Sequence, residues 1–327
     1  MVGLFKGKNP GNAFLLLFYA LILKFPVFLH PRVPALSATD SYLYSGLLRF
    51  LLTFTGGSGI VFSLFSFIIL FLQASLFNRI TNHHKLFPKP NFLAGMSFLL
   101  VTSLIPSWNY FSAPLLVNML MIWAWYRMLN LHSTNQPGAA VFNIGILIGF
   151  CTMLYFPSIV FALLMLFSLV TMRAFRIREW IIGLIGVTTP YYFLFIILYL
   201  GGSWTWDIIF PSVKFRLPAL PTSIWITISI ALLVIPFILG GFFVQNNLNK
   251  MLIQVRKSWS LLLLFLMIAA TIIFMNDDAA YTNWMLTALP FAAFHAAAYY
   301  YPSQRLFPAI LHWLIFGFVL VLAYGNN

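Results

Sequence analysis

Acidic side chains set the first limit on the chemistry of this 327-residue chain, because Asp and Glu together number only five. Carboxylates are the usual general bases and the usual ligands of hard cations. The five are Asp40, Glu179, Asp207, Asp277 and Asp278. When the apolar segments are threaded through a bilayer, all except Glu179 fall on one side. Carboxylate chemistry is therefore expected mainly on that side.

Asp40 is the leading candidate for a catalytic residue. It follows the first apolar segment, and Ser41, Ser45, Arg49 and Thr53 then recur every four residues. This spacing predicts an amphipathic helix that lies in the membrane interface. Asp40 could cap this helix by accepting hydrogen bonds from backbone N–H groups. It could instead serve as a general base or metal ligand that faces a substrate at the membrane surface.

The other acids on this side are secondary candidates. Asp277 and Asp278 are adjacent, and they either bind Mg²⁺ or Mn²⁺ through oxygen ligands or simply form a turn. Asp207 stands beside Trp204 and Trp206, so it is either a further acidic candidate or a solvated acid among interfacial aromatic residues. A divalent cation is thus the one cofactor that these residues suggest.

Four cations on the same side are candidate contacts for a lipid phosphate. They are Arg32, Arg49, Lys214 and Arg216. A guanidinium group suits phosphate because its donors form a planar fork. The competing interpretation is that these long side chains extend to the membrane interface without a specific ligand.

The composition places the chain in a membrane. Hydrophobic residues make up 62% of the sequence, charged residues 7%, and the mean hydropathy is +0.95. A water-soluble domain has roughly a quarter of its residues charged. The net charge of +13 is spread over separate short loops, so it indicates anionic lipid headgroups as partners and not nucleic acid. The single cysteine, Cys151, excludes an intrachain disulfide and a cysteine-based metal cluster.

The sequence predicts an all-α, polytopic membrane protein with about eleven spans and a single transmembrane domain over residues 1–327. A spanning helix needs about 20 mostly apolar residues. The candidate spans are residues 12–30, 58–77, 92–106, 113–130, 139–155, 157–172, 180–200, 222–245, 258–275, 282–301 and 307–324. The first apolar run is too long for a typical signal peptide, so we expect it to be retained.

Cations indicate the orientation. Alternating the spans puts thirteen Lys and Arg residues on one side and five, including Lys24, on the other. By the positive-inside rule the N-terminus is cytoplasmic, and an odd number of spans puts the C-terminus outside. No Asp, Glu or Arg falls in the middle of a span, which argues against an ion-coupled transporter. Gln73, Asn118 and Asn143 are expected to form interhelical hydrogen bonds, and His295 is expected to be packed in the core.

Several turns and polar positions between residues 92 and 200 resemble the transmembrane core of GT-C glycosyltransferases. The run contains Ile105-Pro-Ser-Trp-Asn-Tyr-Phe, Leu154-Tyr-Phe-Pro, Arg173-Ala-Phe-Arg-Ile-Arg and Leu198-Tyr-Leu-Gly-Gly. The resemblance implies a core over approximately residues 1–200, followed by an outer loop and a C-terminal four-helix part over residues 201–327. It also implies a polyprenyl-phosphate sugar donor at the outer face, and an essential acid in the first outer loop, where Asp40 is the match.

A second resemblance covers most of the chain. The Lys8-Asn-Pro opening, Trp125-Tyr-Arg-Met-Leu-Asn-Leu and Arg178-Glu-Trp-Ile-Ile-Gly-Leu resemble an uncharacterised Bacteroidetes family of multi-pass inner-membrane proteins. It implies the bacterial inner membrane as the location, with a periplasmic C-terminus. Two functions stay open, a glycosyltransferase with its site at the outer face and a non-catalytic component of an envelope assembly or secretion complex with protein partners. A transporter is the third alternative.

Overall fold

The computed structural model describes residues 1–7, 9, 11–37, 39–173, 175–209, 211, 213, 215, 221, 223–275, 281–304 and 306–325, without the side chains of residues 207 and 209. Over these residues the predicted all-α fold is confirmed, because the chain forms helices joined by loops and contains no β-strand.

The α-helices of this part of the chain are α1 (Val2–Phe5), α2 (Asn12–Lys24), α3 (Pro26–Leu29), α4 (Tyr42–Thr55), α5 (Gly59–His83), α6 (Leu93–Leu104), α7 (Ala113–Leu129), α8 (Pro137–Leu154), α9 (Phe161–Met172), α10 (Ile177–Leu200), α11 (Trp206–Ile209), α12 (Ile224–Asn247), α13 (Ile253–Ile273), α14 (Ala288–Tyr300) and α15 (Leu306–Tyr324). Short 3-10 helices join them, namely η1 (Pro106–Asn109), η2 (Asn130–His132), η3 (Phe156–Val160), η4 (Leu248–Lys250) and η5 (Thr282–Thr287).

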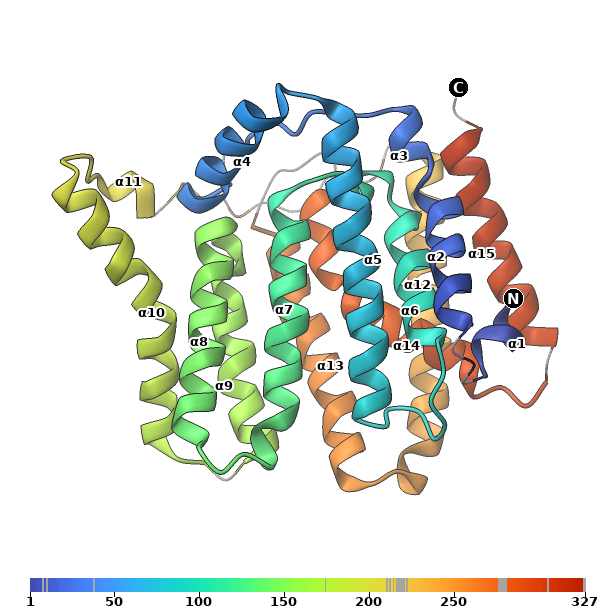
Figure 1. The fold of residues 1–327 in the computed structure, drawn as a ribbon. Coiled ribbons are helices and arrows are strands. Elements are labelled where there is room, and N and C mark those ends of the chain that lie inside the picture. The colour runs from blue at the N-terminus through green and yellow to red at the C-terminus, as the bar shows by residue number, and fades with distance from the viewer. Residues whose placement is uncertain are drawn as a thin grey trace.

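The long helices run side by side between two ends of a bundle (Figure 1). Helices α3 and α4 lie at one end, which we call the α4 end. The loops that follow α5, α7, α9 and α12 lie at the opposite end. These loops carry many of the cations that the sequence assigns to the cytoplasmic side, so the arrangement agrees with the predicted sorting of charge.

Among the described residues, six helices are long and apolar enough to cross a membrane, which indicates a membrane-embedded protein. They are Gly59–His83, Pro137–Leu154, Ile177–Leu200, Ile224–Lys250, Ile253–Ile273 and Leu306–Tyr324. Shorter apolar helices occupy Asn12–Lys24, Leu93–Leu104 and Phe156–Met172. Each of the eleven predicted spans overlaps an α-helix of the described chain, but the number that crosses the bilayer stays a prediction.

Two of the predicted spans, α6 and α14, are short helices enclosed by protein. All twelve residues of α6 are buried, and α6 packs against α14. At a rise of about 1.5 Å per residue, α6 is about 18 Å long, which is shorter than the hydrocarbon core of about 30 Å. Its environment therefore comes from neighbouring helices and not from lipid.

The amphipathic helix predicted after Asp40 is present as α4, which lies across the end of the bundle (Figure 1). Tyr44 and Leu48 are buried on its inner face, whereas Phe50 and Phe54 are 66% and 79% exposed. The helix ends at Gly56, whose φ of 61° is left-handed and favours glycine. An exposed aromatic face on a helix of this orientation suits the membrane interface.

Of the three polar residues predicted to bond between helices, Gln73 and Asn118 do so, whereas Asn143 on α8 is exposed. Gln73 Nε2 on α5 donates to the Leu115 carbonyl on α7 at 2.8 Å, and Asn118 Nδ2 donates to Gln73 Oε1 at 3.2 Å. His295 on α14 is buried, and its Nε2 lies 2.8 Å from the Leu233 carbonyl oxygen on α12. These contacts tie neighbouring helices together.

Candidate functional site

Backbone pairing with the end of α8 fixes the position of Asp40. Asp40 and Tyr155 form an isolated antiparallel bridge. The Ser41 N–H donates to the Leu154 carbonyl at 3.2 Å, and the Ser41 hydroxyl donates to the Thr152 carbonyl at 2.9 Å. Asp40 is therefore anchored to a helix that lies more than a hundred residues further along the chain.

The prediction that Asp40 caps the interfacial helix is wrong. The N-cap of α4 is Ser41, which makes no side-chain capping bond, and α4 begins at Tyr42. Asp40 Oδ2 instead accepts the Ser37 N–H at 2.7 Å, while the Asp40 N–H donates to the Ser37 carbonyl at 3.1 Å. Because the bridge to Tyr155 holds this segment extended, the carboxylate turns back towards the preceding loop.

Asp40 lines a cavity of about 410 Å³ at the α4 end. The loop after α3, the first turn of α4, the segment from η1 to the start of α7, and the start of η5 form its wall. Lining residues include Arg32, Ser37, Tyr44, Tyr110, Tyr155 and Thr282. Burial raises the pKa of Tyr44, and the Asp40 carboxylate raises it further. The Tyr44 phenol is therefore protonated at neutral pH, and its O–H group can donate a hydrogen bond.

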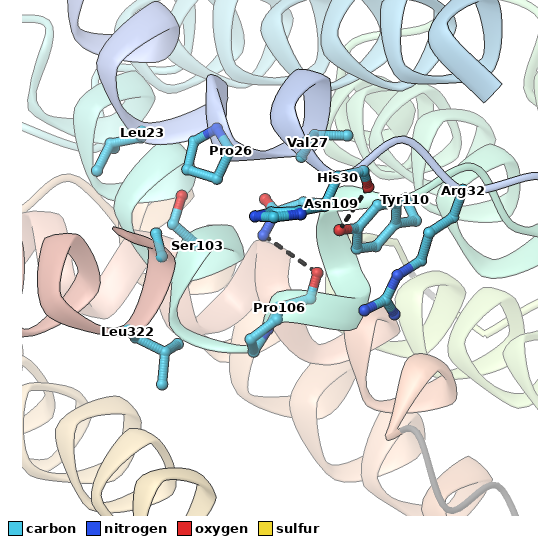
Figure 2. Close-up of a pocket in the computed structure, with 11 residues that line it drawn as sticks. Leu23, Pro26, Val27, His30, Arg32, Ser103, Pro106, Asn109, Tyr110 and Leu322 are labelled. Atoms are coloured by element: carbon cyan, nitrogen blue, oxygen red, sulfur yellow. Dashed lines mark hydrogen bonds between the residues drawn. The ribbon is translucent and has the colours of Figure 1, made fainter. Parts of the chain in front are cut away.

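A second cavity of about 430 Å³ lies on the other side of Arg32 and Tyr110, which line both cavities. Its wall also contains His30, Ser103 and Asn109, together with apolar residues of α2, α3 and α15 (Figure 2). The Arg32 guanidinium carbon lies 4.6 Å from the centre of the Tyr110 ring. The Tyr110 hydroxyl donates to the His30 carbonyl at 3.2 Å. These contacts hold the shared wall together.

The structure brings Asp40 and Arg32 together and leaves Arg49 apart. Arg49 is exposed on α4 and is not among the residues that line either cavity. Four predicted residues, Lys214, Arg216, Asp277 and Asp278, lie outside the described residues. Asp207 belongs to α11, but its side chain lies outside what the structure describes.

Sequence reasoning missed Lys24, which ends α2 and is 1% exposed. Its ammonium group binds side chains of α6 and η1, among them Ser103 and Asn109, which line the second cavity. A lysine at the end of an apolar segment suggests a side chain that reaches outwards to the interface. Only the folded chain shows that this one points inwards.

No group of three His, Cys, Asp or Glu side chains in the described part of the chain could hold a metal ion. Three of the suggested ligands of a divalent cation, Asp277, Asp278 and the side chain of Asp207, lie outside that part. The cavities therefore offer one carboxylate and several cationic or hydroxyl groups, a set suited to proton transfer and anion binding.

Helical architecture and apolar spans define a membrane-embedded protein with its candidate site at the α4 end. The chain belongs to the family of unknown function DUF6427, which matches residues 42–325. Lys24, Arg32 and Asp40 precede the matched region. No curated protein and no solved structure matches the chain. The GT-C likeness and the Bacteroidetes assignment therefore stay predictions.

Proposed function

We propose that this protein is a multi-pass membrane glycosyltransferase of the GT-C kind, which uses a polyprenyl-phosphate-linked sugar at the outer face of the bacterial inner membrane. One observation carries the proposal. Asp40 and a phosphate-binding candidate, Arg32, line the same cavity at the α4 end. A base and an anion-binding group in one cavity are what transfer from a phosphate-linked donor needs.

The proposed reaction assigns a role to each of these side chains. Asp40 removes the proton of an acceptor hydroxyl, whose oxygen then attacks the anomeric carbon of the sugar. The bond between that carbon and the phosphate oxygen breaks, and polyprenyl phosphate leaves with the electron pair. The Arg32 guanidinium stabilises the leaving phosphate through its N–H donors. The protonated Tyr44 hydroxyl is available to orient the acceptor beside Asp40.

The arrangement of the ends supports an outer-face location. Loops rich in Lys and Arg lie at the end opposite to α4 (Figure 1). The positive-inside rule then makes the α4 end periplasmic and places the N-terminus in the cytoplasm and the C-terminus in the periplasm.

One observation favours the alternative, a non-catalytic component of an envelope assembly or secretion complex. The Asp40 carboxylate accepts the Ser37 N–H, so its role could be to order the loop before α4. In that case the α4 end would serve as a docking surface for protein partners.

Two variants of Asp40 separate these functions. Asp40→Asn keeps an oxygen that accepts the Ser37 N–H but removes the base, whereas Asp40→Ala removes both. Purified protein in lipid nanodiscs would be incubated with polyprenyl phosphates that carry different radiolabelled hexoses or pentoses, and released polyprenyl phosphate would be measured. We expect Asp40→Asn to lower turnover by about 100-fold or more at unchanged thermal stability. Full turnover in Asp40→Asn would refute the role of Asp40, and no turnover of any donor by the unaltered protein would favour the non-catalytic function.

A further inference from the structure

Lys24 is a cation enclosed by neutral groups. Its Nζ donates to Thr102 Oγ1 and Ser103 Oγ at 2.8 Å each, and to Asn109 Oδ1 at 2.5 Å. An ammonium group has three N–H donors. All three are therefore used, and they hold the charge at the junction of α2, α6 and η1.

This charge has no acidic partner among the described residues. The ion pair found there joins Arg173 Nε to Glu179 Oε2 at 3.4 Å, and neither residue contacts Lys24. Hydrogen bonds to neutral oxygens satisfy the ammonium donors but do not compensate its net charge. A buried charge without an opposite charge is unfavourable, so burial favours the neutral amine of Lys24, and an anion nearby would favour its ammonium form.

A cavity is lined by two of the side chains that bind Lys24. Ser103 and Asn109, which bind the ammonium group, also line the 430 Å³ cavity. Both are buried, whereas His30 and Arg32 on the same cavity are exposed. Figure 2 shows these polar side chains around one cavity. The cavity thus runs from an exposed mouth that carries a cation to a buried polar base, and Lys24 lies behind two residues of that base.

The apolar part of the wall indicates what accompanies the anion. Leu23 and Val27 come from the segment of α2 and α3, and Leu322 comes from α15. The cavity volume lies within the range of about 300 to 1,000 Å³ that is common for small-molecule sites. A cavity with a cationic half and an apolar half matches an amphiphile with an anionic headgroup.

We propose that this cavity binds the phosphoryl group of a phosphate-linked ligand, with His30, Arg32 and Asn109 as direct contacts and Lys24 as the fixed charge behind them. The inference deepens the proposed function by naming its phosphate subsite, which meets the Asp40 cavity at Arg32 and Tyr110. It rests on that function only for the lipid nature of the ligand. Arg49 on α4 has no part in this subsite.

Ligand-induced stabilisation of the purified protein in detergent tests the proposal. The probes are farnesyl phosphate, farnesol and inorganic phosphate, and the readout is the shift of the thermal unfolding midpoint with probe concentration. We expect farnesyl phosphate to raise the midpoint and farnesol to leave it unchanged. A midpoint that also rises with inorganic phosphate would show that the phosphoryl group suffices. A rise with farnesyl phosphate alone would show that the lipid chain is required.

Lys24→Met removes the charge and keeps a long side chain, and Arg49→Met is the matched control at the same end of the bundle. A unit charge about 6 Å from a phosphate, at an effective dielectric constant of about 20, changes affinity by about 100-fold. We expect this loss in Lys24→Met and unchanged affinity in Arg49→Met. Should Lys24→Met fail to fold, Arg32→Gln at the exposed mouth is expected to weaken binding at least several-fold.

Equal affinity of the unaltered protein, Lys24→Met and Arg32→Gln would overturn the proposal, as would equal stabilisation by farnesol and farnesyl phosphate. Asp40→Asn distinguishes a failure here from a failure of the glycosyltransferase function. That variant is expected to bind farnesyl phosphate normally, because the Asp40 carboxylate does not line this cavity.

Discussion

Gly240 and Gly241 stand next to each other in α12, but only Gly241 has room for a methyl group. A Cβ atom on Gly240 would overlap the Phe294 carbonyl oxygen of α14 and lie 2.6 Å from the Phe294 carbonyl carbon. A Cβ atom on Gly241 would meet no atom within 4 Å. Replacing each by alanine therefore makes the same chemical change with opposite structural consequences.

The expected magnitudes follow from this geometry. Carbon atoms pack best at about 3.5 to 4.0 Å, so Gly240→Ala must move α12 and α14 apart by about 1 Å. Overpacking of this kind costs about 1 to 3 kcal/mol, and the movement also stretches the contact between His295 and the Leu233 carbonyl. Alanine favours a helix over glycine by about 1 kcal/mol. We expect Gly240→Ala to destabilise the fold by about 2 kcal/mol and Gly241→Ala to stabilise it by up to about 1 kcal/mol.

Unfolding in mixed micelles, driven by an increasing fraction of sodium dodecyl sulfate and followed by tryptophan fluorescence, measures both values. The chain has ten tryptophans, so the signal is adequate. Equal stability changes in the two variants, or a stabilised Gly240→Ala, would show that α12 and α14 do not make this close approach.

Two further predictions concern the two ends of the bundle. Cys151 is the only cysteine and is fully buried, so it should not react with a membrane-impermeant maleimide. Thr53→Cys on α4 should react with this reagent in intact cells, whereas His83→Cys should react only after lysis. The reverse pattern would invert the orientation. Burial, together with the neighbouring His83 and His132, lowers the pKa of His84 from 6.5 to about 4. Because the folded state then binds fewer protons than the unfolded state, stability should be complete above pH 6.5 and decline as the pH falls towards 4. His84→Asn should reduce this decline in the micelle assay, and an unchanged pH dependence would assign it to another group.

Local patterns in the sequence were enough to predict much of the architecture. Each apolar run that predicted a span overlaps an α-helix of the described chain. The polar residues that recur every four positions predicted α4. The interhelical bond between Gln73 and Asn118 could also be predicted, because a polar side chain in a span has few partners except another helix. The environment of each helix was less predictable. Apolar composition does not distinguish α6, which is enclosed by protein, from a helix in contact with lipid.

For the candidate site, the residue types could be predicted but not their partners. Asp40 and Arg32 were identified because an acid and a guanidinium beside an interfacial helix suggest proton transfer and phosphate binding. The pairing of Asp40 with Tyr155, the inward turn of Lys24 and the wall that Arg32 shares with Tyr110 join segments distant along the chain. The sequence by itself indicated a membrane-embedded protein and the residue types that reach the α4 end, because hydropathy and helical periodicity are local properties. Only the tertiary structure decided which of them meet around a cavity, because that depends on how helices far apart in the sequence pack against one another.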